Sequence, residues 1–120
     1  MSDEYQIHIP PSFEAVHRDA RGRLTLARDD FRARYELCED MAQLLVDRCQ
    51  ALHHDQGLDE ATILERMAAG LASEGSDFAM AEAGWVVTRL AELLNWPWPG
   101  LDALRAQAQA QADARASRLG

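Results

Sequence analysis

The strongest regular pattern of apolar residues lies in the middle of the chain. Apolar side chains recur there every three or four residues, at Phe31, Tyr35, Cys38, Ala42, Leu45, Cys49 and Leu52. This spacing places them along one side of an α-helix. Leu37, Met41 and Leu44 are expected to widen that side, and a wide stripe favours packing against two or more other helices. The pattern predicts a long helix that begins near Thr25 and ends near Gly57.

A second amphipathic helix is predicted directly after Gly57. Asp59 is expected to cap its start, with Leu58 and Ile63 at the spacing of a hydrophobic staple. Its apolar side comprises Ile63, Leu64, Met67, Ala68 and Leu71. Because the turn is tight, these two helices are expected to be antiparallel neighbours.

A turn at residues 73–77, around Gly75, should lead into a third principal helix from about Met80 to Asn95. Its inward side chains are predicted to be Ala83, Val86, Val87, Leu90, Leu93 and Leu94. Another side carries small residues, Ala81, Gly84, Thr88 and Ala91. Glycine destabilises a helix unless a neighbouring backbone needs the space, so this side predicts a close helix contact.

The two ends of the chain are less regular. Residues 5–9 alternate apolar and polar and predict a short extended segment. Ser12 is then expected to cap a short helix with Phe13, Val16 and His17 on one side, ended by the turn at residues 19–23. Residues 101–120 are rich in alanine, glutamine and arginine, which predicts a C-terminal helix that docks at its start and frays towards its end.

These elements predict an all-α fold, a small bundle of three principal helices with a short N-terminal helix and a partly frayed C-terminal helix. A chain of 120 residues with 48% apolar content suits one core. Residues 1–100 are expected to form a single helical domain with an extended N-terminal segment, and residues 101–120 an Ala/Gln-rich helix or tail.

Composition removes several function classes. The chain has no lysine, so its 12 basic side chains are all arginine, and a phosphate-loop ATPase or a Schiff-base enzyme is not expected. A net charge of −8 argues against nucleic acid as a partner. No apolar stretch approaches the roughly 20 residues of a membrane span, and the acidic N-terminus differs from a secretion signal, so the expected location is the cytoplasm without membrane contact.

Three stretches carry a resemblance to a known family: "IHIPPSF" at residues 7–13, "ARYELCEDMAQLLVDR" at 33–48 and "AEAGWVVTRLAELLNWP" at 81–97. They resemble a family of small proteobacterial proteins of unknown function, some of which are labelled "ATPase with chaperone activity". The resemblance implies association with a chaperone. It implies no ATPase site here, because the chain lacks the glycine-rich loop and lysine that such a site requires.

Candidate metal ligands have simpler interpretations. Glu36, Glu39 and Asp40 lie within two helical turns, but Arg32 precedes Glu36 by four residues, the spacing of a surface ion pair. A di-iron bundle needs two Glu-x-x-His motifs, and the chain offers one, Glu14 with His17.

Two adjacent histidines and two cysteines complete the candidates. His53 and His54 point about 100° apart on a helix, which favours placement near its C-terminus over a zinc site. Cys38 and Cys49 lie about 16 Å apart along the predicted helix, too far to bridge, and are expected to be reduced and buried. No metal or cofactor site is predicted.

The tryptophans carry the one candidate binding site. Trp85 precedes Arg89 by four residues, which allows a cation–π contact, and Trp96 and Trp98 flank a proline that breaks the helix. One interpretation is that these aromatic residues cap an end of the bundle. The other is a partner-binding patch of Trp85, Arg89, Trp96 and Trp98.

The sequence therefore predicts a non-enzymatic protein-interaction or adaptor module, with a protein partner of undetermined identity and a homo-oligomer as a further option. A small-ligand or metal-binding bundle that uses His8, His17, His53 or His54 is the alternative. A third option is an ATP-related chaperone accessory without its own ATPase site.

Overall fold

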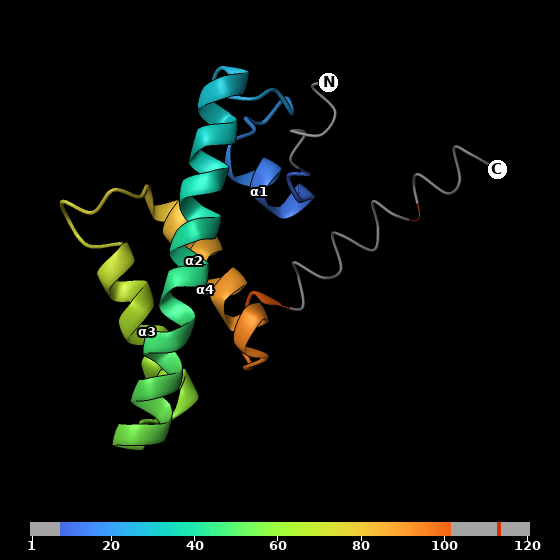
Figure 1. Cartoon of the computed structure of the whole chain (residues 1–120). Helices are drawn as coiled ribbons and strands as arrows, with labels where there is room; N and C mark the ends of the chain where they lie inside the picture. Colours follow the sequence, from blue (N-terminus) through green and yellow to red (C-terminus); the bar gives the residue numbers. More distant parts are fainter. Residues whose placement is uncertain (1–7, 102–112, 114–120) are drawn as a thin grey trace, which may run out of the picture.

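The computed structural model describes residues 8–101 and 113, and it is all-α over this part of the chain. Four helices follow one another: α1 (Pro11–Val16), α2 (Arg28–Gln56), α3 (Glu60–Leu71) and α4 (Met80–Leu94). They pack into one bundle (Figure 1). The prediction of three principal helices and a short N-terminal one is confirmed. The expected extended segment and C-terminal helix lie mostly outside the described residues.

Helix α4 lies at the centre of the bundle. It packs against each of the other three helices. Its buried side chains are Glu82, Ala83, Trp85, Val86, Val87, Leu90 and Ala91. They cover more than one side of the helix, because a helix enclosed by neighbours has little solvent-facing surface.

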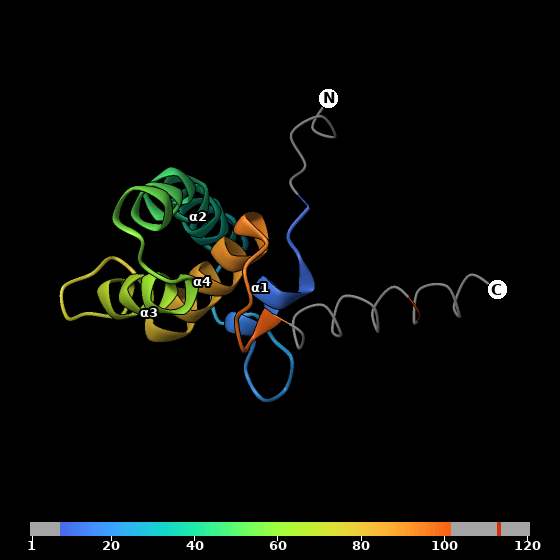
Figure 2. The same cartoon turned by 90° about the horizontal axis from the view of Figure 1, so that it is seen from below.

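Helix α2 lies at an edge of the bundle, and the other described helices are all to one side of it (Figure 2). Of its 29 residues only four are buried: Phe31, Cys38, Ala42 and Cys49. Tyr35, Leu45 and Leu52 pack partly buried against the same core, so the predicted stripe is confirmed.

The predicted width of that stripe is wrong. Leu37 is 39% exposed and Leu44 is 72% exposed, whereas Met41 packs partly buried against the core. The side of α2 that carries Leu37 and Leu44 points away from the other described helices. Apolar spacing showed that these leucines share a helix side but could not show that none of the described helices covers it.

The turn between α2 and α3 forms as predicted. Gly57 ends α2 with φ 69°, a left-handed conformation that glycine adopts without strain. The Asp59 carboxylate then accepts a hydrogen bond from the Thr62 N–H at 3.2 Å and caps α3. Leu58 packs partly buried against the core, as a staple residue does. The two helices run antiparallel (Figure 1).

Two predicted helix starts are wrong, because the hydroxyl groups expected to mark them bond elsewhere. Thr25 donates its backbone N–H and its hydroxyl to the His17 carbonyl at 2.7 and 3.0 Å, and α2 begins three residues later at Arg28. Ser12 lies inside α1, whose N-cap is Pro10. Its hydroxyl accepts a hydrogen bond from the Trp85 indole instead of capping the helix.

The small residues of α4 do not form the predicted close contact. A Cβ atom added at Gly84 would meet nothing within 4 Å, and Ala81 and Gly84 are both exposed. The close approach occurs at Thr88, whose Oγ1 would lie 3.2 Å from a Cβ atom at Gly100. The segment that follows α4 therefore folds back against Thr88. Among the described residues, no helix combines the length and apolar character that crossing a bilayer requires.

Candidate partner-binding groove

The segment after α4 is held in a fixed path by its own backbone. Asn95 ends α4 with φ 59°, a left-handed conformation in which asparagine is common. The Trp96 N–H then donates to the Ala91 carbonyl at 2.9 Å, and the Leu101 N–H donates to the Trp98 carbonyl at 3.0 Å. Pro97 has no N–H to satisfy and its φ is restricted. The chain between Asn95 and Leu101 thus leaves the helix in a defined turn.

The two tryptophans of this segment have different surroundings. Trp96 is buried, with 8% of its surface exposed, and its ring lies 5.3 Å from that of His53 at 61°. His53 is fixed in turn, because its Nδ1 lies 2.7 Å from the Leu58 carbonyl oxygen. Since that oxygen only accepts, Nδ1 carries the proton and donates it. Trp98 is only half-buried and packs on the core from outside.

A groove of about 690 Å³ opens between this segment and α3. Its walls are Ala61, Glu65, Asn95, Trp96, Pro97, Trp98, Pro99 and Leu101. The segment contributes aromatic and proline rings, and α3 contributes a methyl group and one carboxylate. Rings of this kind present large contact areas while losing little conformational entropy on binding.

Trp85 and Arg89 do not take part in this groove. Trp85 is 6% exposed and its ring contacts Phe13 and Tyr35, with centroids 5.1 and 5.9 Å away. Its indole N–H donates to the Ser12 hydroxyl at 2.9 Å. These contacts make Trp85 a core residue at the junction of α1, α2 and α4. Only Trp96 and Trp98 of the four predicted patch residues line the groove.

The cation–π contact that the spacing of Trp85 and Arg89 suggests is not formed. Arg89 instead donates to both carboxylate oxygens of Glu39, at 2.9 and 3.0 Å, and to Glu92 at 2.7 Å. These hydrogen bonds raise the pKa of Arg89. Two carboxylates attract a guanidinium more strongly than an aromatic ring does. The sequence showed the i, i+4 spacing but not that Glu39 of α2 lies across from Arg89.

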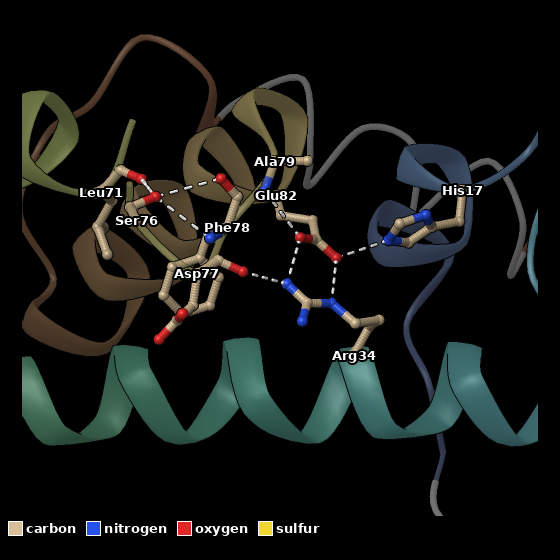
Figure 3. Close-up of polar contacts among 8 residues, drawn as sticks. All are labelled: His17, Arg34, Leu71, Ser76, Asp77, Phe78, Ala79 and Glu82. Carbon is tan, nitrogen blue, oxygen red and sulfur yellow. Dashed lines mark hydrogen bonds and ion pairs between the residues drawn. The ribbon is translucent and has the colours of Figure 1, made fainter. Parts of the chain in front are cut away.

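A buried ionic cluster joins three helices, and the sequence reasoning missed it (Figure 3). Glu82 is 2% exposed, and its carboxylate accepts hydrogen bonds from Arg34 at 2.9 and 2.6 Å. His17 Nε2 donates to the same carboxylate at 2.8 Å, and the Ala79 N–H donates at 3.0 Å. Arg34 also donates to the Asp77 carbonyl at 2.7 Å.

The hydrogen-bond partners of Glu82 keep its carboxyl group ionised despite burial. Burial by itself raises the pKa of this carboxyl group, but hydrogen bonds from Arg34, the Ala79 N–H and His17 outweigh burial and lower the pKa to about 2. The carboxylate therefore stays ionised at neutral pH. The one sequence signal was the position of Glu82 in the first turn of α4, where a glutamate commonly accepts from the N-cap amide. Nothing in the sequence pointed to Arg34, 48 residues earlier.

Four of the carboxylate and histidine candidates for metal binding have polar protein partners. Arg32 binds Glu36 at 3.1 Å, which confirms the predicted surface pair, and Glu39 binds Arg89. His17 binds Glu82 and His53 binds the Leu58 carbonyl, while His8 and His54 are exposed. Among residues 8–101 and 113, no three His, Cys, Asp or Glu side chains are grouped as metal ligands.

Both cysteines are buried and unpaired with each other, as predicted. Burial raises the pKa of the Cys38 thiol to about 12 and also raises that of Cys49. A thiol with a raised pKa and no solvent access is a poor nucleophile. Cys38 and Cys49 therefore serve as packing residues where α2 contacts the hydrophobic core.

No protein-family model, no curated protein and no solved structure matches this sequence significantly. The resemblance to the chaperone-labelled family thus stays a prediction from three short stretches of sequence.

Proposed function

We propose that the protein is an interaction module that binds a partner protein in the groove between α3 and residues 95–101. The observation that carries the proposal is the groove itself, with Trp98 half-buried on its wall and Trp96 fixed beneath. Interface anchors are typically tryptophans held rigidly next to a pocket. A rigid wall lowers the entropy lost when a partner binds.

The rest of the described structure gives this proposal further support. The core is closed by packing, the cysteines are buried, and the strongest charge cluster serves to join α1, α2 and α4. The groove is where aromatic side chains meet open volume. A chaperone is the partner class that the sequence resemblance suggests.

Site-specific photo-crosslinking in cells of the native host tests the proposal. A benzophenone amino acid replaces Ala61, which lines the groove, or Ala69, which is equally exposed on α3 but does not line it. A discrete adduct is expected from position 61 and not from position 69. Trp98→Ala should abolish the adduct while the far-ultraviolet circular dichroism stays unchanged. Identical adducts from both positions, or none, would contradict the proposal.

A small organic ligand is the second candidate for the same groove. Its volume of about 690 Å³ falls within the range of small-molecule sites, roughly 300 to 1,000 Å³. Binding of such a ligand would block crosslinking at position 61 by any protein. Calorimetric titration with ATP checks the ATP-related option, for which no heat of binding is expected because the chain has no lysine.

A further inference from the structure

We infer that the groove recognises an arginine side chain of its partner, presented next to apolar residues. This inference rests on the proposed function, since it names the chemistry of the group that enters the same groove. The walls combine aromatic faces, a single charged group of negative sign, and the C-terminal end of a helix. Each of these features favours a cation.

The first feature is the Glu65 carboxylate, the only charged side chain among the eight wall residues. The eight described wall residues include no arginine or histidine, so none of them neutralises Glu65. Glu65 is exposed, so its attraction for a cation is modest by itself and adds to that of the aromatic faces. Guanidinium binds carboxylate through two parallel N–H groups, which adds orientation to attraction.

The second feature is the end of α4. Asn95, the C-cap residue, lines the groove, and the last turn of α4 contains no basic residue. The C-terminal end of a helix carries a partial negative charge, which natural sequences often neutralise with lysine, arginine or histidine. The Ala91 and Glu92 carbonyls accept backbone hydrogen bonds from Asn95 and Trp96, and no basic side chain in the last turn of α4 offsets the partial charge that remains at this end.

The neighbouring N-terminal end of α3 would by itself oppose a cation. A helix N-terminus carries partial positive charge. Asp59 neutralises this end, because its carboxylate accepts hydrogen bonds from the Thr62 N–H at 3.2 Å and from the Thr62 hydroxyl at 2.6 Å. Those hydrogen bonds lower the pKa of Asp59, so the charge persists at neutral pH.

The aromatic rings of the groove favour a cation that has apolar residues next to it over a free cation. Trp96, Trp98, Pro97 and Pro99 line the side of the groove that faces α3, with Trp98 half-buried and Trp96 8% exposed, and Leu101 and Ala61 extend the apolar surface. A guanidinium can stack flat on an indole, and the apolar residues next to that arginine in a peptide can contact the remaining apolar surface. The chain as a whole carries a net charge of −8, which also favours a basic partner.

Two short peptides test this inference on the full-length protein. The first is Ac-Ala-Leu-Arg-Leu-Ala-NH2, and the second replaces arginine by citrulline, which has the same shape without the charge. Each is titrated to millimolar concentration while the indole N–H signals are followed by nuclear magnetic resonance. The Trp85 indole, bonded to Ser12 in the core, is an internal control that should not move.

The arginine peptide is expected to shift the Trp98 indole signal with a Kd about tenfold lower than that of the citrulline peptide. Glu65→Gln should remove most of that preference. Glu74→Gln, the same change at an exposed residue that does not line the groove, should preserve it. Trp98→Phe identifies the Trp98 signal and should weaken binding of both peptides.

Equal binding of both peptides would overturn the inference while leaving the groove as a site for apolar segments. A Trp98 signal that responds to neither peptide would overturn it as well. Failure of the proposed function is a separate result, because it appears as loss of the position-specific adduct at residue 61. The two experiments therefore distinguish a wrong ligand chemistry from a wrong site.

Discussion

Arg34 of α2 forms a bidentate ion pair with the carboxylate of Glu82 of α4, with Nε 2.9 Å from Oε2 and Nη2 2.6 Å from Oε1. Glu82 is 2% exposed and the Arg34 side chain 31% exposed. Together with the His17 hydrogen bond, this pair fixes the relative position of α1, α2 and α4.

Glu82→Gln should lower the free energy of unfolding by about 2 to 4 kcal/mol, because it leaves Arg34 and the Ala79 N–H without their charged acceptor. Urea denaturation followed by circular dichroism measures the change. The matched control is Glu36→Gln, which breaks an exposed pair with Arg32 and should lower the free energy by less than about 1 kcal/mol. Similar losses in both variants would show that the buried cluster contributes no more than a surface pair.

Acid should destabilise the fold through Glu82. Its pKa in the folded protein, about 2, is below its ordinary value of 4.5, so the unfolded chain takes up this proton at a higher pH than the folded protein. The resulting stabilisation, on the order of 3 kcal/mol, is present above pH 4.5 and is lost as the pH falls from 4.5 towards 2. Unfolding free energies of the wild type and Glu82→Gln should therefore converge over this range. A constant difference between them would contradict the assignment.

The Trp85 indole and the Ser12 hydroxyl should be coupled by about 1 kcal/mol. Trp85→Phe removes the indole N–H while keeping an aromatic ring among Phe13 and Tyr35, and Ser12→Ala removes the acceptor. A double-mutant cycle on unfolding free energies isolates the hydrogen bond from the loss of ring packing. Strictly additive effects would show that α1 is held by ring contacts alone.

Gly84→Ala should raise the free energy of unfolding by up to about 1 kcal/mol, because alanine has higher helix propensity and its methyl group would meet nothing within 4 Å. Gly57→Ala should lower the free energy of unfolding by about 1 kcal/mol, because φ there is 69° and a left-handed backbone strains alanine but not glycine. Thermal unfolding of the two variants separates the effects by sign. If Gly84→Ala were destabilised instead, the result would indicate a close helix contact at Gly84, contrary to the structure.

Turns, helix caps and the buried side of α2 could be predicted from the sequence, because they depend on residues close together in the chain. Gly57 and Asp59 marked the turn between α2 and α3 because left-handed backbone and side-chain capping are properties of single residues and their near neighbours. The spacing of Phe31, Cys38 and Cys49 identified the buried side of α2 for the same reason. The rings of Trp96 and Trp98 were recognisable as a candidate site, because prolines interrupt the helix there.

Tertiary structure alone decided what lies across from each side chain. Ser12 and Thr25 had the chemistry of helix caps, but their partners are Trp85 and the His17 carbonyl. Leu44 matched the spacing of a buried residue and lies on the open side of α2.

The same limit applied to the charges and to the groove. Arg89 pairs with Glu39 and Arg34 with Glu82, over separations of 50 and 48 residues. Glu65 lines the same groove as Trp96 and Trp98 only because α3 packs beside their segment. Periodicity and capping follow from covalent neighbours, whereas ion pairs and binding sites depend on which helix surfaces meet, and that is fixed by the packing of the whole chain.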